Sequence, residues 1–468
     1  EACGLWKMNS QFEKIVAMAG DAAEVSLVRV AAIQALAAYG TPTSLQRAVE
    51  LAGNAPLTRE RVAAVNAVAS VSPQLGSKVA VQLLQEAPKD LVVDEVVREL
   101  VSRKGGEQVL VKALDGVKLQ GDVAKLLVRA VRNTGRPAES LLNAIRTAGG
   151  LTAGGWKLDA KLMEALLASV QKDGQAKIGE AIYRRANLQC MKCHAIGGAG
   201  GKVGPDLVSL GGSAQLDYLV ESLLLPNKKV KENFHALQVL REDGRVVSGV
   251  PVRQNKKELV LRTAEDKLVT IPVGIIEESR VGRSLMPDGT VDSLTREELV
   301  HLVRFLSELG KLGDFAVGKE QVARRWETLL FTREANQRLN RTSFDTAASG
   351  DAALQWGAAY SAVSGSLPVD ALPRFQLRRG TNPTSFVRAE LVVTTAGKIQ
   401  LVCQDPQGLS LWIDGRPRPL LADNQWELSR GRHVITLAID RQLRVAPLRL
   451  ELLPVTSNGA QVQWRTGK

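Results

Sequence analysis

The stretch that decides the fold of the first third of the chain is RVAAIQAL at residues 29–36, which returns 32 residues later as RVAAVNAV at residues 61–68. Looser versions follow at residues 94–103 and 122–132. Apolar residues recur at the helical spacing of three and four. Because a two-helix unit cannot bury its apolar face alone, neighbouring copies must stack. The repeat predicts an all-α solenoid over residues 1–172, with an irregular helical bundle as the alternative.

The composition fits a folded protein of several domains. At roughly 150 residues per domain, 468 residues predict about three domains, and 45% hydrophobic with 4% aromatic residues are typical of a globular, helix-rich chain. No run of about 18 apolar residues is present, so we expect no membrane span. The net charge of +12 favours anionic partners. Without a nucleic-acid-binding signature, we expect no nucleic acid. The charge is expected to lie on solvated helix faces rich in Arg and Lys, which would favour an acidic protein partner.

The chemistry of the chain centres on Cys-Met-Lys-Cys-His at residues 190–194, in a sequence with only four cysteines and four histidines. This is the spacing of c-type haem attachment. Cys190 and Cys193 can each form a thioether with one porphyrin vinyl group, and His194 can supply the proximal nitrogen, so we expect one covalent haem c. The alternatives are a zinc site, which needs four ligands, and a redox-active dithiol. Such a dithiol normally opens a helix after a strand, whereas this motif is expected to close a helix over residues 174–188.

The motif lies in a region, residues 173–312, whose pattern differs from the repeat. Helical patterns before the motif and at residues 295–309 enclose a segment, about 234–280, in which apolar and polar residues alternate as in strands. Thr295 and Glu298 have the spacing of a capping box at the start of the last helix. The pattern predicts an α domain with a β insertion.

The rest of the chain is expected to form a linker and a β domain. Residues 313–345 are charged and predict a linker with one helix at about 320–330. Residues 346–468 contain short alternating segments separated by turns such as Asp414-Gly415. This spacing is typical of an all-β sandwich. Trp412, within one of these segments, is expected in the core rather than as a platform for a sugar.

The loop after the motif resembles the corresponding loop of class I cytochromes c. It reads GGAGGKVGPDL at residues 197–207. By this resemblance, the carbonyl oxygen of Pro205, which follows Gly204, accepts a hydrogen bond from the His194 ring. Such a bond fixes the orientation of the ring and increases its basicity as a ligand. Leu207 is expected to pack on the porphyrin, and an ordinary glycine-rich turn is the alternative.

A second segment, SLMPDG at residues 284–289, is similar to the distal ligand segment of cytochromes c. This resemblance makes Met286 the second axial ligand of the iron, and a thioether ligand favours the ferrous state. Pro287 is expected to stiffen the loop. A buried core methionine is the alternative. His235 and His301 are rival ligands, although each is expected in a surface or packing position.

The order of motifs across residues 173–312 resembles PVC-type cytochromes, the haem-binding CxxCH domains of the Planctomycetes–Verrucomicrobia group. HEAT-like repeats often precede the cytochrome in that family, as residues 1–172 do here. The segments at 408–415 and 428–433 resemble PA14-like β-sandwiches more weakly. Glycan-binding members hold calcium through adjacent aspartates, whereas the matching position here is Asp405-Pro406. The implied architecture is a HEAT-like solenoid, a class I cytochrome c-like domain and a PA14-like sandwich.

These resemblances imply one-electron transfer through a single haem c with His194 and Met286 as axial ligands. Electrons would come from a sugar or alcohol dehydrogenase, on the same longer polypeptide or on a partner, and leave to another carrier. No catalytic motif is evident, so the chain is expected to be an electron-transfer module rather than an enzyme. Covalent haem attachment implies export to the periplasm or the cell surface.

Two other functions stay open. A scaffold or recognition protein would bind a partner or a glycan through the solenoid and the sandwich, with the haem secondary. A haem enzyme or gas sensor would require that Met286 be displaced from the iron, and it would bind carbon monoxide when reduced. In an oxidising compartment, Cys3 and Cys403 could also form a disulfide.

Overall fold

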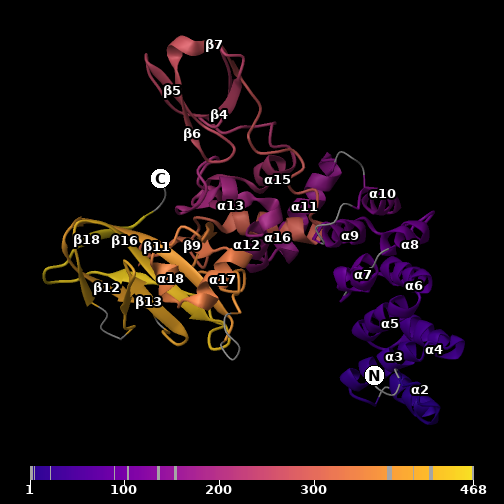
Figure 1. Ribbon diagram of the computed structural model, residues 1–468. Coiled ribbons are helices and arrows are strands. Elements are labelled where there is room, and N and C mark those ends of the chain that lie inside the picture. The colour runs from indigo at the N-terminus through magenta and orange to yellow at the C-terminus, as the bar shows by residue number, and fades with distance from the viewer. Residues whose placement is uncertain are drawn as a thin grey trace. The chain divides into compact units, whose positions relative to one another are not determined.

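The chain folds as an N-terminal helical region followed by several antiparallel β-sheets, as the computed structural model shows (Figure 1). It divides into two compact units, Glu1–Asp159 with Gly289–Leu299, and Ala160–Asp288 with Val300–Lys468. The structure describes residues 4, 6–21, 23–88, 90–102, 105–133, 138–151, 155–376, 382–403, 405–420 and 425–465.

The helical part of the first unit is built from pairs of helices after α2 (Phe12–Gly20). The first members of the pairs are α3 (Ser26–Tyr39), α5 (Thr58–Val71), α7 (Val93–Ser102) and α9 (Gly121–Asn133). The second members are α4 (Pro42–Asn54), α6 (Pro73–Glu86), α8 (Gly106–Ala113) and α10 (Glu139–Ala148). Helices α3 and α5 both have 14 residues and carry the two copies of the repeat. The small apolar side chains of all these paired helices, mostly alanine, valine and leucine, fill one continuous core.

A buried ion pair joins the first two repeats. Arg29 on α3 contacts the carboxylate of Glu60 on α5 at 2.6 Å, and Ser26 donates a hydrogen bond to the same oxygen at 2.6 Å. The side chain of Glu60 has no exposed surface. A buried charge must be paired to be tolerated, so this contact fixes how α3 and α5 pack.

The Cys-x-x-Cys-His motif belongs to the second unit, which also contains most of the remaining helices. They are α11 (Ala160–Asp173), α12 (Ala176–Tyr183), α13 (Cys190–Cys193), α14 (Leu210–Ser213), α15 (Leu216–Leu224) and most of α16 (Arg296–Glu308). The helix expected over residues 174–188 is shorter, because α12 ends at Tyr183 and a 3-10 turn, Ala186–Leu188, follows it. Gln189 then adopts a left-handed conformation with φ 55°, which interrupts the helical path. The motif therefore forms a helical turn of its own, and the expectation that it closes the preceding helix is wrong.

The start of α16 has the expected capping box. The backbone nitrogen of Glu298 donates to the Thr295 hydroxyl at 3.1 Å, and the backbone nitrogen of Thr295 donates to the Glu298 carboxylate at 3.0 Å. These two bonds satisfy donors that would otherwise be left without partners at the helix start. They fix the point at which the chain enters the last helix after the Met286 segment.

The β insertion is a five-stranded antiparallel sheet in the order β6-β5-β4-β3-β7. Its strands are β3 (Leu237–Arg241), β4 (Val246–Gln254), β5 (Glu258–Arg262), β6 (Leu268–Pro272) and β7 (Ile276–Val281). The sheet curls around its own apolar core (Figure 1). Strand β7 shows no alternation between buried and exposed residues, because five of its six residues are exposed.

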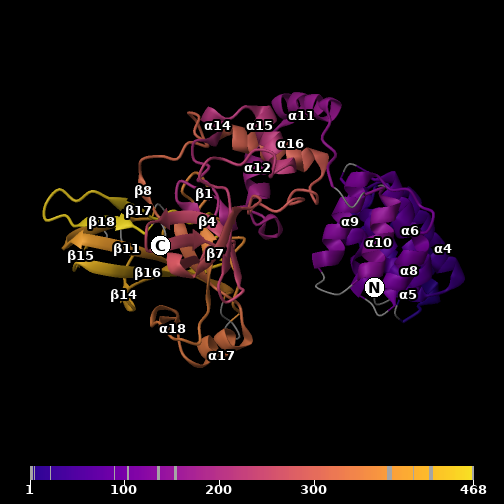
Figure 2. The same ribbon diagram turned by 90° about the horizontal axis from the view of Figure 1, so that it is seen from above.

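The C-terminal part contains two antiparallel sheets that share a hydrophobic core (Figure 2). The larger sheet contains β10 (Trp356–Tyr360), β9 (Arg325–Leu329), β11 (Thr384–Thr395), β16 (Gly431–Asp440), β13 (Leu409–Ile413), β14 (Arg416–Arg418) and β18 (Gln461–Trp464). The smaller sheet contains β15 (Gln425–Leu428), β12 (Gly397–Val402), β17 (Glu451–Leu453) and β8 (Gln321–Val322). Trp412 lies in this region with 5% of its surface exposed, as expected for a core residue.

The linker expected at residues 313–345, with a helix at about 320–330, is wrong. Strands β8 and β9 occupy that segment, and they pair with β17, β10 and β11. The helices come later, at α17 (Arg333–Arg341) and α18 (Asp345–Ala348). The apolar side chains of Val322, Trp326 and Leu329 are spaced by four and three, so they fit a helix face although they belong to strands.

Candidate haem-attachment site

The two cysteines of the motif lie at the two ends of the turn α13. Positions three apart on a helix lie on the same side, and the His194 backbone nitrogen closes the turn by donating to the Cys190 carbonyl at 2.8 Å. Both thiols are free. Burial raises the pKa of Cys190 to about 11 and also raises the pKa of Cys193. Thiols of a redox-active dithiol have lowered pKa values, so these two do not match that alternative.

The ring of His194 is held by the loop that follows it. Its Nδ1 lies 3.0 Å from the carbonyl oxygen of Pro205, which is the expected hydrogen bond. Burial lowers the pKa of His194, although the bond to Pro205 acts in the opposite direction. A neutral ring that donates through Nδ1 keeps the lone pair of Nε2 free to bind a metal. Gly204 lies against this ring, and its backbone nitrogen donates to the Cys193 carbonyl at 2.8 Å.

Asp206 fixes the glycine-rich loop, a role that we did not assign from the sequence. Its carboxylate accepts hydrogen bonds from the backbone nitrogens of Gly197, Gly198 and Val208 at 3.0, 3.0 and 2.9 Å. The next residue, Leu207, is buried, and its backbone nitrogen donates to the carbonyl of Ala195 at 2.8 Å. The only signal for Asp206 in the sequence was its place directly after the Gly-Pro pair.

Tyr183 is a second residue that the sequence did not indicate. Its hydroxyl, at the end of α12, donates to the backbone carbonyl of His194 at 3.1 Å. The ring packs against Phe305 on α16, which packs in turn on Phe315. Burial raises the pKa of Tyr183 well above its usual value, so the hydroxyl remains a donor. The backbone at His194 is therefore tied to the helices α12 and α16.

The rival histidines are both placed as packing or surface residues. His301 is buried on α16, and its Nδ1 accepts a hydrogen bond from the backbone nitrogen of Gln175 at 3.1 Å. His235 is exposed next to the start of β3.

Met286 lies half-buried in the loop between β7 and α16. Its backbone nitrogen donates to the Ser284 hydroxyl at 3.1 Å, and the backbone nitrogen of Ser284 donates to the Asn227 side chain at 2.9 Å. Asn227 also donates to Asp288 at 2.9 Å. The loop is thereby fixed to the segment after α15. No hydrogen bond in the described residues joins Met286 to the loop of residues 190–207.

The second unit also ties the motif region to the C-terminal sheets. Arg184, directly after α12, donates to the backbone carbonyls of Ser361, at 3.0 Å, and Tyr360 on β10. Glu180 on α12 accepts a hydrogen bond from the backbone nitrogen of Val363 at 2.7 Å. Arg325 on β9 donates to the carbonyl of Gly200, in the loop after the motif, at 3.2 Å. The sheets therefore contribute directly to the shape of the motif region.

The donor set fits a covalently attached haem. Two free thiols on one face of a turn, an imidazole oriented by Pro205, and Gly204 beside the ring are the groups that the chemistry requires. A zinc site needs further ligands. Among the described residues, no group of three or more His, Cys, Asp or Glu side chains is placed to hold a metal ion.

Three further observations concern expectations outside the motif. Asp405, at the position that resembles a calcium site, pairs with the buried Arg444 at 3.4 Å. Cys403 is a free thiol, and Cys3 lies outside the described residues. No helix in the described ranges has the length and apolar character needed to cross a membrane.

Comparisons with known proteins give no assignment. A scan against protein-family models finds no match, and a search of curated proteins finds no similar chain.

Proposed function

We propose that this chain is an electron-transfer protein with one covalently bound haem c. Cys190 and Cys193 would hold the group through thioethers, and His194 and Met286 would be its axial ligands. The bound group would supply a one-electron Fe(III)/Fe(II) couple. The observation that carries the proposal is the His194 ring, oriented by the Pro205 carbonyl and placed directly over Gly204.

The residues of the chain have separate tasks in this proposal. Pro205 orients the imidazole and increases its basicity, while Asp206 and Tyr183 hold the backbone on either side of the ring. Asn227 holds the Met286 loop through Ser284. Filling both axial positions would leave no site for substrate, so the role is electron transfer rather than catalysis.

The architecture proposed with this function is that of a PVC-type cytochrome. It comprises a HEAT-like solenoid, a class I cytochrome c-like domain with a β insertion, and a PA14-like β-sandwich. Its electron donor would be a sugar or alcohol dehydrogenase, on the same longer polypeptide or on a partner, and its acceptor another carrier. The location would be the periplasm or the cell surface, since covalent haem attachment takes place outside the bacterial cytoplasm.

The second candidate is a scaffold or recognition protein. A groove of about 480 Å³ lies on the first helices of successive repeats and favours this reading. Gln34 on α3, Asn66 on α5 and Glu95 on α7 are among the polar side chains that line it. In this case binding of a partner or a glycan would survive loss of the haem.

An optical redox titration of the protein, matured in a host that attaches haem c, tests the first proposal. We expect a low-spin c-type spectrum, reversible reduction and no reaction with carbon monoxide. Met286→Ala is expected to give a high-spin haem that binds carbon monoxide. Met191→Leu is the matched control, because Met191 lies between the two cysteines and should not change the spectrum. Absence of covalent haem would overturn the proposal, and an unchanged Met286→Ala spectrum would remove Met286 from the ligand set.

A further inference from the structure

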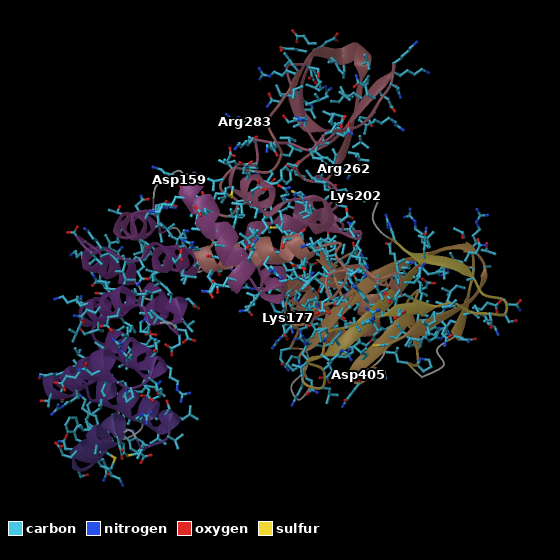
Figure 3. The ribbon with its side chains drawn as sticks, turned by 180° about the vertical axis from the view of Figure 1, so that it is seen from behind. Asp159, Lys177, Lys202, Arg262, Arg283 and Asp405 are labelled. Carbon is cyan, nitrogen blue, oxygen red and sulfur yellow. The ribbon has the colours of Figure 1, made fainter. Side chains whose placement is uncertain are left out.

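A charged pair at the hairpin of β5 and β6, Arg262 at the end of β5 and Asp266 in the turn, contacts the loop after the motif. One carboxylate oxygen of Asp266 accepts a hydrogen bond from the backbone nitrogen of Lys202 at 3.3 Å. The other accepts from the Arg262 guanidinium at 2.5 Å. Lys202 and Arg262 can be located in Figure 3. The β insertion therefore contacts the loop of the candidate haem site through this turn.

The contacted loop lies directly on the backbone of the motif. The backbone nitrogen of Gly201 donates to the carbonyl of Met191 at 2.9 Å. A Cβ on residue 201 would lie only 1.8 Å from the carbonyl oxygen of Lys192 and 3.1 Å from the backbone nitrogen of Cys193. Asp266 thus holds a loop whose own backbone contacts the motif.

The side chains of Arg262 and Asp266 are less exposed to solvent than that of Glu265 in the same turn. The exposed fractions are 13% for the Arg262 side chain and 25% for the Asp266 side chain, whereas Glu265 is exposed. Charges that are partly buried are screened less by salt and water than exposed ones.

We infer that Asp266 and Arg262 set the reduction potential of the haem in opposite directions, an inference that rests on the proposed function. Oxidised haem carries one more positive charge than reduced haem. A carboxylate held against the loop after the motif therefore stabilises the oxidised form and lowers the potential. The guanidinium of Arg262 opposes this effect. The β insertion thereby acts as an electrostatic element of the haem site.

The test compares midpoint potentials of three charge-neutralising variants by spectroelectrochemical titration. Asp266→Asn is expected to raise the potential. Asparagine keeps an acceptor for Lys202 and tolerates the left-handed backbone at this position, where φ is 60°. Arg262→Gln is expected to lower the potential. Glu265→Gln is the matched control, because it removes an exposed carboxylate from the same turn, and its smaller shift should disappear at high salt.

Because the two variants are expected to shift the midpoint potential in opposite directions, the test distinguishes an electrostatic effect from structural damage. Loosening of the turn would affect both members of the pair and move both potentials in one direction, with a changed haem spectrum, and that result would overturn the inference. Unchanged potentials in Asp266→Asn and Arg262→Gln would also overturn it, while a low-spin covalent haem in the same samples would leave the proposed function intact. Wild-type protein without covalent haem would overturn both.

Discussion

Gly204 lies so close to the ring of His194 that a Cβ on residue 204 would be 2.4 Å from the ring carbon Cε1 and 2.7 Å from Nδ1. The ring therefore occupies the volume that any other residue type would need at position 204. Together with the Pro205 carbonyl, 3.0 Å from Nδ1, this contact fixes both the position and the orientation of the imidazole. Position and orientation of a ligand are the properties that surrounding residues control in a metal site.

Gly204→Ala is expected to displace the His194 ring and to reduce covalent haem content several-fold. Overpacking of this kind also lowers the free energy of unfolding by about 1–3 kcal/mol. The haem content is measured from the absorbance of the denatured haem per mole of protein. Gly274→Ala, in the β insertion, is the control, because a Cβ there has no atom within 4 Å. Equal haem contents in the two variants would show that the close contact is unimportant.

Glu60→Ala is expected to lower the free energy of unfolding of the helical region by roughly 3–5 kcal/mol, because it leaves the buried Arg29 without its carboxylate. The measurement is urea unfolding followed by far-ultraviolet circular dichroism. Glu50→Ala removes an exposed carboxylate paired with Arg47 at 2.8 Å, and an exposed pair contributes about 1 kcal/mol or less. Similar losses of unfolding free energy in the two variants would contradict the prediction that the buried pair contributes more than the exposed pair.

The contacts of His433 lead us to expect that the stability of the C-terminal sheets depends on pH. Its ring nitrogens lie 2.6 Å from Asp414 and 2.8 Å from the Ser429 carbonyl, so both can donate only when the ring is protonated. Burial lowers the pKa of His433, but the two hydrogen bonds and the Asp414 charge together raise it above 6.5. The stabilisation is therefore complete below about pH 6.5 and is lost as the pH rises through the higher pKa of the folded state.

The measurement is the difference in Tm between wild type and His433→Gln. We expect the difference to be largest at about pH 6 and to shrink by about pH 9, since glutamine does not titrate in this range. A difference that stays constant across this range would mean that His433 is not protonated in the folded protein.

Calcium is expected to leave the Tm of the C-terminal sheets unchanged. Arg444 is 4% exposed, and its guanidinium already neutralises Asp405 at 3.4 Å. A cation would have to displace this buried guanidinium, which would then lack its partner. Scanning calorimetry with added calcium and with a chelator checks this expectation, and a higher Tm in calcium would contradict it.

The helical repeat was the most predictable part of the fold. The matching stretches at residues 29–36 and 61–68 lie within α3 and α5, because their strong helical period leaves no strand alternative. The hydrogen bond between His194 and Pro205 was also expected, since it joins residues of two adjacent motifs. Both features depend on local sequence.

The parts that were not predicted depend on contacts between distant segments. The segment with Val322 and Trp326 fits a helix face in sequence, and only its pairing with β17, β10 and β11 makes it β8 and β9. Tyr183 and Asp266 reach the motif region from other elements. No local pattern marks them, because tertiary packing alone brings them there.

The hydrogen bonds of Glu180 and Arg184 to the segment of residues 360–363 also have an evolutionary consequence. Recombination that exchanged the C-terminal sheets for another domain would leave a partly buried guanidinium and a carboxylate on the motif side without their backbone partners. Homologous chains should therefore inherit the Cys-x-x-Cys-His region and these sheets as a pair, and lineages that lack the sheets should carry other residues at the positions of Glu180 and Arg184.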